Sequence, residues 1–428
     1  MFKNKVVKNA AWIIACKIVQ SVFSIVVTML TARFLGPSGY GIINYAASIV
    51  AFVAPIMMLG LNSTLVQEFV QEPDKEGESL GTALLMSFSS SFLCILGVIA
   101  FTLIANPGEK TTTLVCGLYS LLLIFQALEL TQYWFQAKLK SKYTSIVMLI
   151  AYVIVSVYKI VLLVTGSSIY FFAISQALDF MIIAFALLII YKKIGGPKLS
   201  FSRACAKRML QRSKHYILSN LMINLVVHTD KVMLKLMLSD EATGWYSAAT
   251  ACCLLTNFVF TAIIDSARPS VLENKKNNEA AFEKSVSRLY SVILYLALLQ
   301  SVFVCIFAPL IVKILYGSEY AASVNALRLA VWYTPFAYIG SVRNIWILAE
   351  GKQKYLWLLN LSGAVVNVVL NFLLIPEWGV MGAALASLIT QVFSNYLLNY
   401  LIPPLRRNNT LLVKGLNPKL LTEMLKRM

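Results

Sequence analysis

Six cationic side chains lie within long apolar segments of the sequence, where a charge needs a partner or a ligand. They are Lys17, Lys159, Lys231, Lys235, Arg328 and Arg343. A charge at the centre of a lone membrane helix costs about 2.5–3.5 kcal/mol on insertion scales, so these groups should face water, a carboxylate or the membrane interface. Lys159 and Lys235 lie near segment ends, and we expect both to extend to the interface. The candidates for a cationic cavity are the other four: Lys17, Lys231, Arg328 and Arg343. Such a cavity would bind an anionic substrate, and structural ion pairs are the alternative.

Four acidic side chains also fall within apolar segments, namely Glu129, Asp179, Asp230 and Asp265. Asp265 precedes Arg268 by three residues at a segment end, which favours a local surface pair. Glu129 lies near the middle of its segment on a polar stripe, so it is the first candidate for a protonatable or cation-binding residue. Asp179 is the second candidate. Pairing of these carboxylates with an intramembrane lysine is the alternative.

Uncharged polar side chains recur at helical spacing in several of the same segments. One stripe is formed by Asn220, Asn224 and His228, and others contain Ser24 and Thr28, Asn367 and Asn371, or Ser387, Gln391 and Asn395. Regular recurrence of this kind predicts helix faces that are wetter than lipid. Hydrogen bonding between neighbouring helices is the alternative for any single member.

The segments that carry these side chains are apolar enough to cross a membrane. The chain has 428 residues, 59% hydrophobic and 13% charged, whereas a soluble domain averages about 45–50% apolar and about 25% charged residues. A crossing helix needs about 20 mostly apolar residues. We therefore expect an all-α polytopic membrane protein with twelve transmembrane helices, at about 9–34, 40–68, 80–105, 112–137, 144–165, 168–191, 214–238, 243–267, 287–316, 322–349, 354–375 and 379–403. A β-barrel is excluded because segments such as 146–165 do not alternate apolar and polar residues.

The basic residues predict the topology of these spans. The formal net charge is +18, and most Lys and Arg residues fall in alternate gaps between the apolar segments. By the positive-inside rule both termini are cytoplasmic, and the charge indicates membrane orientation rather than nucleic-acid binding. The longest of these basic gaps follows the sixth span and separates the chain into halves. The expected domains are an N-terminal six-helix lobe (1–192), a cytoplasmic linker (193–213), a C-terminal six-helix lobe (214–404) and a cytoplasmic or interfacial tail (405–428).

An internal repeat supports two pseudo-symmetric lobes around a central cavity. The segment "LGPSGYGIINY" at 35–45 aligns without gaps on "LSDEATGWYSA" at 238–248, an offset of 203 residues. The same offset places Lys17 on Asn220 and Thr28 on Lys231, so the polar stripes of the two halves also coincide.

Enzymatic and metal-binding motifs are absent from the sequence. It contains no P-loop, HExxH, GxSxG or C-x-x-C motif, and the seven cysteines mostly lie inside apolar segments without metal-ligand spacing. The outward gaps are too short to carry a catalytic domain. We therefore predict a protein that is not an enzyme and that has no metal site and no cofactor.

Three segments resemble a known family. "NAAWIIACKIVQSVFS", which opens the stretch 9–46, resembles the start of the polysaccharide-biosynthesis flippases, the Wzx-type branch of the multidrug/oligosaccharidyl-lipid/polysaccharide exporter (MOP) superfamily. "QYWFQAKLKSKY" at 132–143 is similar to the family's sequence at the exit of the fourth span, and 315–391 is similar to its most recognisable stretch. Together these segments sample both halves of the chain.

The resemblance implies a transporter whose two lobes enclose a V-shaped cavity. Such a protein flips undecaprenyl-pyrophosphate-linked oligosaccharide across the bacterial cytoplasmic membrane by alternating access, for synthesis of O-antigen, capsule or exopolysaccharide. Its partners would be that lipid-linked oligosaccharide, membrane lipids, and the polysaccharide polymerase and chain-length machinery. Either H⁺ or Na⁺ could be the coupling ion. A drug or metabolite antiporter of the same superfamily is the main alternative, although it should prefer acidic cavity walls; a non-transporting assembly subunit is a third.

We predict that both chain ends face the cytoplasm and that Thr111 and Glu319 face outward. In a background without native cysteines, Thr111→Cys and Glu319→Cys should react in intact cells with a membrane-impermeant thiol reagent. Lys207→Cys, in the basic linker, is the control and should react only after the cells are permeabilised. Labelling of Lys207→Cys in intact cells would reverse the assigned orientation.

Overall fold

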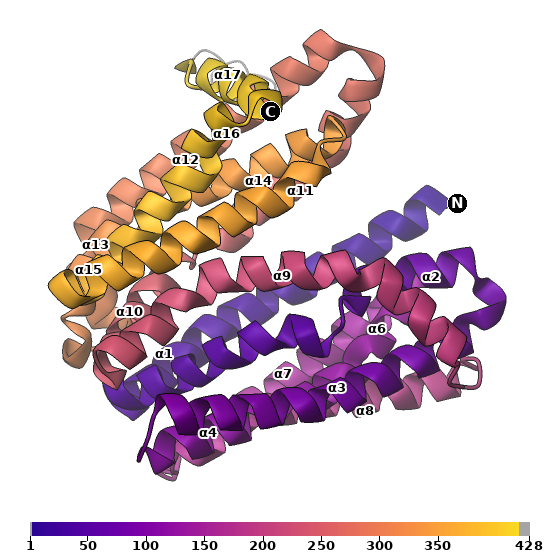
Figure 1. Cartoon of the computed structure of the whole chain (residues 1–428), viewed down its shortest axis with the longest axis horizontal. Helices are drawn as coiled ribbons and strands as arrows, with labels where there is room; N and C mark the ends of the chain where they lie inside the picture. The colour runs from indigo at the N-terminus through magenta and orange to yellow at the C-terminus, as the bar shows by residue number, and fades with distance from the viewer. Residues whose placement is uncertain (1, 419–428) are drawn as a thin grey trace. The chain divides into compact units, whose positions relative to one another are not determined.

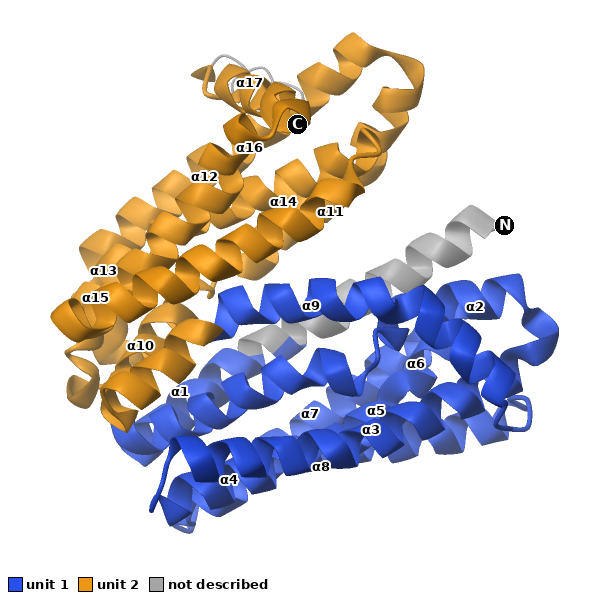
Figure 2. Ribbon diagram, in the orientation of Figure 1, with its two compact units in different colours: residues 1–228 blue, residues 229–428 orange. Residues whose placement is uncertain are grey.

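The regular elements are helices, as expected for a chain that must satisfy its backbone hydrogen bonds in lipid (Figure 1). The computed structural model describes residues 2–418, and it describes the side chains of Gln20 and of residues 23–418. No strand occurs in this part of the chain. The helices form two compact units, unit 1 (residues 1–228) and unit 2 (residues 229–428), coloured separately in Figure 2. The expectation of an all-α protein is therefore confirmed.

Several helices are suited to crossing a membrane, so the chain is a multi-pass membrane protein. In the described residues seven helical segments are long and apolar enough, or eight if the pair α10 and α11, bent by 45°, is one span. The expected number of twelve is not confirmed. One reason is that 23–57 and 353–401 each pass as a single segment, although each contains a break that the sequence interpretation had placed between two spans.

Unit 1 is built from the first eight helices and the greater part of the ninth. Their bounds are α1 Phe2–Met57, α2 Leu65–Gln71, α3 Glu76–Ala105, α4 Lys110–Ser120, α5 Leu122–Leu128, α6 Gln132–Ala137, α7 Ser141–Val164, α8 Ile169–Lys193 and α9 Arg203–Met237. Three short 3₁₀ turns, at Leu61–Ser63, Pro73–Lys75 and Glu129–Thr131, join or interrupt them. Helix α1 packs against α3, α4 and α7, and α8 packs against α4, α5 and α7.

Unit 2 continues from the end of α9. Its helices are α10 Asp240–Cys253, α11 Asn257–Asn277, α12 Glu279–Leu315, α13 Ser323–Ala330, α14 Tyr333–Ala349, α15 Leu356–Val392, a π-helix at Phe393–Leu397, α16 Leu398–Leu401 and α17 Arg406–Gly415. Turns of 3₁₀ type lie at Ser318–Tyr320, Gln353–Tyr355 and Pro403–Leu405. Helix α12 packs against α11, α13, α14 and α17, and its core includes the fully buried Phe282, Tyr290 and Trp346.

The internal repeat marks equivalent helix breaks in the two halves. Gly36 interrupts α1 with φ 65°, a left-handed conformation that glycine adopts without a steric penalty. The residue 203 positions later is Ser239, which lies between α9 and α10. Its hydroxyl accepts a hydrogen bond from the backbone N–H of Ala242 (3.2 Å) and so caps α10. Both aligned segments thus contain a helix break, although the backbone is left-handed at Gly36 and extended at Ser239.

The connection between α8 and α9 is fixed to unit 1. Residues 197–202, which we call the strap, have no regular secondary structure and lie along α3. The Ser200 N–H donates to the carbonyl of Gly77 (3.3 Å), and the Ser202 N–H donates to the hydroxyl of Thr82 (3.0 Å). Glycine is needed on α3, because a Cβ at Gly77 would lie 2.2 Å from the carbonyl oxygen of Lys198. The strap is therefore a docked segment with a defined place on α3.

Ion pairs attach α17 to α12 in unit 2. The Arg407 guanidinium contacts Glu283 at 2.8 Å and also pairs with Glu279, while the Lys414 ammonium lies 3.1 Å from Glu283. The hydrogen bond to Glu283 raises the pKa of the Arg407 guanidinium above its usual value. The part of the expected tail up to residue 418 thus begins with a helix that is bound to unit 2; residues 419–428 lie outside the described residues.

Candidate functional site

The polar centre of unit 1 contains both acidic residues singled out in the sequence. Glu129 lies where α5 ends, on the 3₁₀ turn Glu129–Thr131 that precedes α6, and only 6% of its surface is exposed. Its side chain is hydrogen-bonded to Gln132 and interacts electrostatically with Asp179 of α8. The structure therefore brings the two candidate proton- or cation-binding residues together.

A single lysine faces this pair of carboxylates among the described side chains. Lys159 of α7 interacts electrostatically with Asp179. The expectation that Lys159 extends to the interface missed this interaction, because the sequence does not reveal which helix faces it. The Oδ1 atom of Asp179 is buried and has no hydrogen-bond partner among the described residues. Among the described side chains, this cluster thus combines two carboxylates with one ammonium group.

The polar stripe of α1 also faces the interior of unit 1. Tyr152 of α7 is hydrogen-bonded to Ser24 of α1 and to Ser156 of its own helix. Ser24 belongs to the stripe that includes Lys17, whose side chain lies outside the described residues. We expected this polar face of α1 to be wetter than lipid. At Ser24, where its side chain is described, the face is directed at α7.

Unit 2 has a different polar centre around Asp230, a buried residue of α9. Asn367 and Asn371 of α15 donate amide hydrogen bonds to its Oδ1 at 2.9 and 2.6 Å. Tyr246 of α10 and Ser387 of α15 donate their hydroxyls to its Oδ2. Four neutral donors therefore surround the carboxylate, and they join three helices.

Sequence reasoning named Asp230 as an intramembrane carboxylate but gave it no role. The available signal was the spacing of Asn367 and Asn371, which places both amides on one face of a helix. Lys231, the adjacent residue and one of the four candidate cavity cations, interacts electrostatically with Asp230. The ion pair between Asp265 and Arg268, at 3.1 Å, is confirmed.

Arg343 is buried in unit 2, with 3% of its surface exposed. Its guanidinium donates to the backbone carbonyl of Ser394 at 2.7 Å and to the side-chain oxygen of Asn344 at 3.2 Å. Ser394 lies in the π-helix Phe393–Leu397, whose altered hydrogen-bond pattern leaves backbone groups for side chains to satisfy. Arg343 therefore stabilises this π-helix through its hydrogen bond to Ser394.

The other predicted cations and the polar residues of α9 make different kinds of contact. Arg328 of α13 is exposed and donates to the carbonyl of Cys305 (3.4 Å). Lys235, expected at the interface, is buried and forms an ion pair with Asp240 at 2.7 Å. On α9, the Asn224 amide donates to the backbone carbonyl of Asn220, and the His228 ring makes an edge contact with Phe52. A single cavity shared by the four candidate cations stays a prediction.

The polar centres around Glu129 and Asp230 contain carboxylate, amide and hydroxyl groups. Such oxygen-rich groups suit a proton or a hard cation such as Na⁺, not a soft metal. In the described part of the chain no group of three or more His, Cys, Asp or Glu residues could hold a metal ion.

Comparison with known proteins identifies relatives along most of the chain. A family model described as "Polysaccharide biosynthesis protein" matches residues 30–325. The capsular polysaccharide biosynthesis protein CapF of Staphylococcus aureus is 21% identical over 90% of this chain and 96% of its own length. A putative O-antigen transporter of Shigella flexneri is 22% identical over 92% of this chain and 97% of its own length.

Solved structures share the fold at low sequence identity. The lipid II flippase MurJ in an inward closed conformation has a TM-score of 0.73 and 13% identity, over 97% of this chain and 92% of that chain. An inward-facing multidrug resistance MATE transporter of the MOP superfamily has a TM-score of 0.67 and 13% identity, over 91% of this chain and 96% of that chain. These names describe transporters and a flippase, and the fold is that of a polytopic membrane protein.

We predict that the Asp230 centre stabilises unit 2. Asp230→Leu would leave four donors without their acceptor, and a buried unsatisfied polar group costs about 1–3 kcal/mol. Thermal unfolding in detergent should show a clearly lowered midpoint. Asp265→Leu, at an exposed surface pair, is the matched control and should change stability by about 0.5 kcal/mol or less. Equal midpoints for the two variants would contradict a stabilising role for Asp230.

Proposed function

The chain belongs to the family of polysaccharide biosynthesis proteins, and on this premise we propose that it flips an undecaprenyl-pyrophosphate-linked oligosaccharide across the bacterial cytoplasmic membrane. The family match across more than half of the chain is the observation that carries the proposal. Translocation by alternating access would deliver oligosaccharide units to the outer leaflet for synthesis of a surface polysaccharide. It involves no covalent chemistry on the substrate.

The cations within the apolar segments support an anionic substrate. A pyrophosphate group placed in a cavity of low dielectric is attracted by ammonium and guanidinium groups more strongly than in water. We assign this role to Lys17, Lys231, Arg328 and Arg343. Arg343 already binds a backbone carbonyl, so its substitution should also disturb the π-helix. Lys17 and Lys231, which occupy polar stripes of the two halves, are the better probes of substrate binding.

The polar centre of unit 1 supports coupling to an ion. Among the described side chains, Glu129 interacts with Asp179, and Asp179 interacts with one ammonium group, that of Lys159. The cluster therefore has room for one proton or one Na⁺, whose arrival would neutralise the remaining charge. We propose Glu129 as the coupling residue and Asp179 as its partner.

A drug or metabolite antiporter is the second candidate function, because the fold is shared with a multidrug transporter. Cationic drugs would favour acidic walls, whereas the apolar segments here contain more Lys and Arg than Asp and Glu. Export of surface polymer by cells that depend on this chain separates the two functions, since a drug antiporter would not restore it.

We predict that charge removal at the proposed pyrophosphate site abolishes polymer export. Cells lacking their own flippase and expressing Lys17→Gln or Lys231→Gln should show little surface polymer, although the variants reach the membrane at normal levels. Lys17→Arg should retain partial export, because it keeps the positive charge. Lys110→Gln, an exposed lysine, is the control and should export normally. Normal export by both glutamine variants would exclude the proposed site, and failure of the unmodified chain to restore any polymer would exclude the function itself.

We predict that Glu129→Gln removes the dependence of transport on an ion gradient, because an amide cannot exchange a proton or balance a Na⁺. Purified protein in lipid vesicles would be supplied with lipid-linked oligosaccharide under an imposed H⁺ or Na⁺ gradient. The exposed Glu273→Gln variant should respond to the gradient as the unmodified protein does. Loss of the response in Asp179→Asn alone would transfer the role to Asp179, and a normal response in both variants would place coupling elsewhere.

A further inference from the structure

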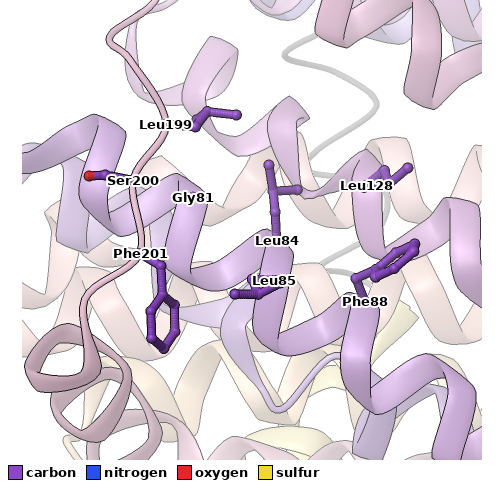
Figure 3. Close-up of a pocket in the computed structure, with 8 residues that line it drawn as sticks. All are labelled: Gly81, Leu84, Leu85, Phe88, Leu128, Leu199, Ser200 and Phe201. Carbon is purple, nitrogen blue, oxygen red and sulfur yellow. The ribbon is translucent and has the colours of Figure 1, made fainter.

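An apolar groove of about 360 Å³ lies beside the strap in unit 1 (Figure 3). Its walls are Leu84, Leu85 and Phe88 of α3 together with Leu199 and Phe201 of the strap, and Leu128 at the end of α5 closes it. All these elements belong to the same compact unit.

The strap presents large apolar side chains outward although it is held firmly. Leu199 and Phe201 are 44% and 54% exposed, and Leu85 beside them is 47% exposed. The strap's hydrogen bonds to Gly77 and Thr82 fix its backbone, so the groove is already formed. Exposed apolar side chains that gather at one place mark a surface that binds something apolar.

The groove begins near the N-terminal end of α3. It starts at Gly81, five residues after the first residue of α3, and a helix rises about 1.5 Å per residue. Its start is therefore about 8 Å from the first residue of α3, inside the candidate membrane span 73–105. The headgroup layer on each side of a bilayer is about 5–8 Å thick, the difference between the full thickness and the hydrocarbon core. A headgroup layer that begins at the first residue of α3 would therefore end about where the apolar walls begin.

Basic residues flank the apolar part of the strap. Lys198 precedes Leu199, and Arg203 is the first residue of α9; both are exposed, and neither forms an ion pair with any described residue. Arg208 and Arg212 on the next turns differ, because both bind the buried Glu68, at 2.8 and 2.7 Å. The structure thus separates cations used for packing from cations available to a phosphate at the membrane surface.

We propose that the strap and α3 form a binding site for an anionic diacyl phospholipid of the bilayer. An acyl chain lies in the groove against Phe88 and Phe201, and the lipid phosphate is held by Lys198 and Arg203. Charge complementarity favours this occupant, because an apolar groove with two unpaired cations at its headgroup end matches a lipid that is apolar at one end and anionic at the other. The site is independent of the proposed transport function.

The test is native mass spectrometry of the full-length protein, titrated with phosphatidylglycerol or with phosphatidylcholine of the same acyl chains. Phosphatidylglycerol should be retained preferentially, and Lys198→Gln combined with Arg203→Gln should weaken its retention about tenfold or more. The matched control, Lys276→Gln, removes the charge of an exposed lysine in unit 2. This variant should retain the lipid as the unmodified protein does. Equal retention of the two lipids, or no change in the double variant, would overturn the proposal.

A second variant addresses the groove itself without altering any charge. Leu85→Trp would fill the groove and should reduce retention of phosphatidylglycerol, whereas Leu103→Trp, at another exposed position of α3 outside the groove, should not. Undecaprenyl phosphate provides the competing arm. If it displaces phosphatidylglycerol at lower concentration and its own retention is lost in Leu85→Trp, the groove binds the isoprenoid chain and the phospholipid assignment is wrong.

Discussion

A polar group inside a membrane must find its partner within the protein, and the described structure is organised around this constraint. Asp230 of α9 is the clearest case, because its two oxygens accept hydrogen bonds from two other helices, α10 and α15. Arg343 is a buried donor that meets the same requirement, because its guanidinium donates to the carbonyl of Ser394 in the π-helix. Each of these contacts determines where a helix can lie, so burial of polarity, more than apolar packing alone, specifies how the helices of unit 2 meet.

The two units satisfy the constraint by different chemistry. In unit 2 amides and hydroxyls donate hydrogen bonds to both oxygens of a single carboxylate, which also interacts electrostatically with Lys231. In unit 1 the described partners of Glu129 are another carboxylate, Asp179, and through it the ammonium of Lys159. A centre of this kind gains stability when it takes up a positive charge, which is the property that ion coupling requires. The contrast explains why removal of Asp230 should affect stability and removal of Glu129 should affect the response to a gradient.

The sequence was sufficient for the helical class, the family and the repeat, because these depend on local composition and spacing. Gly36 and Ser239 mark the two matching helix breaks at the predicted offset. The sequence could not show which residues pair with each other. Lys159 and Lys235 were both expected at the interface, yet Lys159 interacts with Asp179 and Lys235 with Asp240. Such pairs form between residues of different elements, and hydropathy does not reveal which faces meet. The role of Asp230 was missed for the same reason, since its donors come from positions up to 157 residues away.

The basic residues from the end of α8 into the first turns of α9 have several physical roles, although the sequence shows them only as one cluster of positive charge. These lysines and arginines predict orientation together, but Arg208 and Arg212 bind Glu68 while Lys198 and Arg203 remain at the surface. The strap lies in the expected linker (193–213), and its hydrogen bonds to α3 give it a defined place in unit 1. The division between the two compact units falls after His228, within α9 itself. The element that passes from one unit to the other is therefore α9, at the polar stretch that carries Asn220, Asn224 and His228, and not the strap.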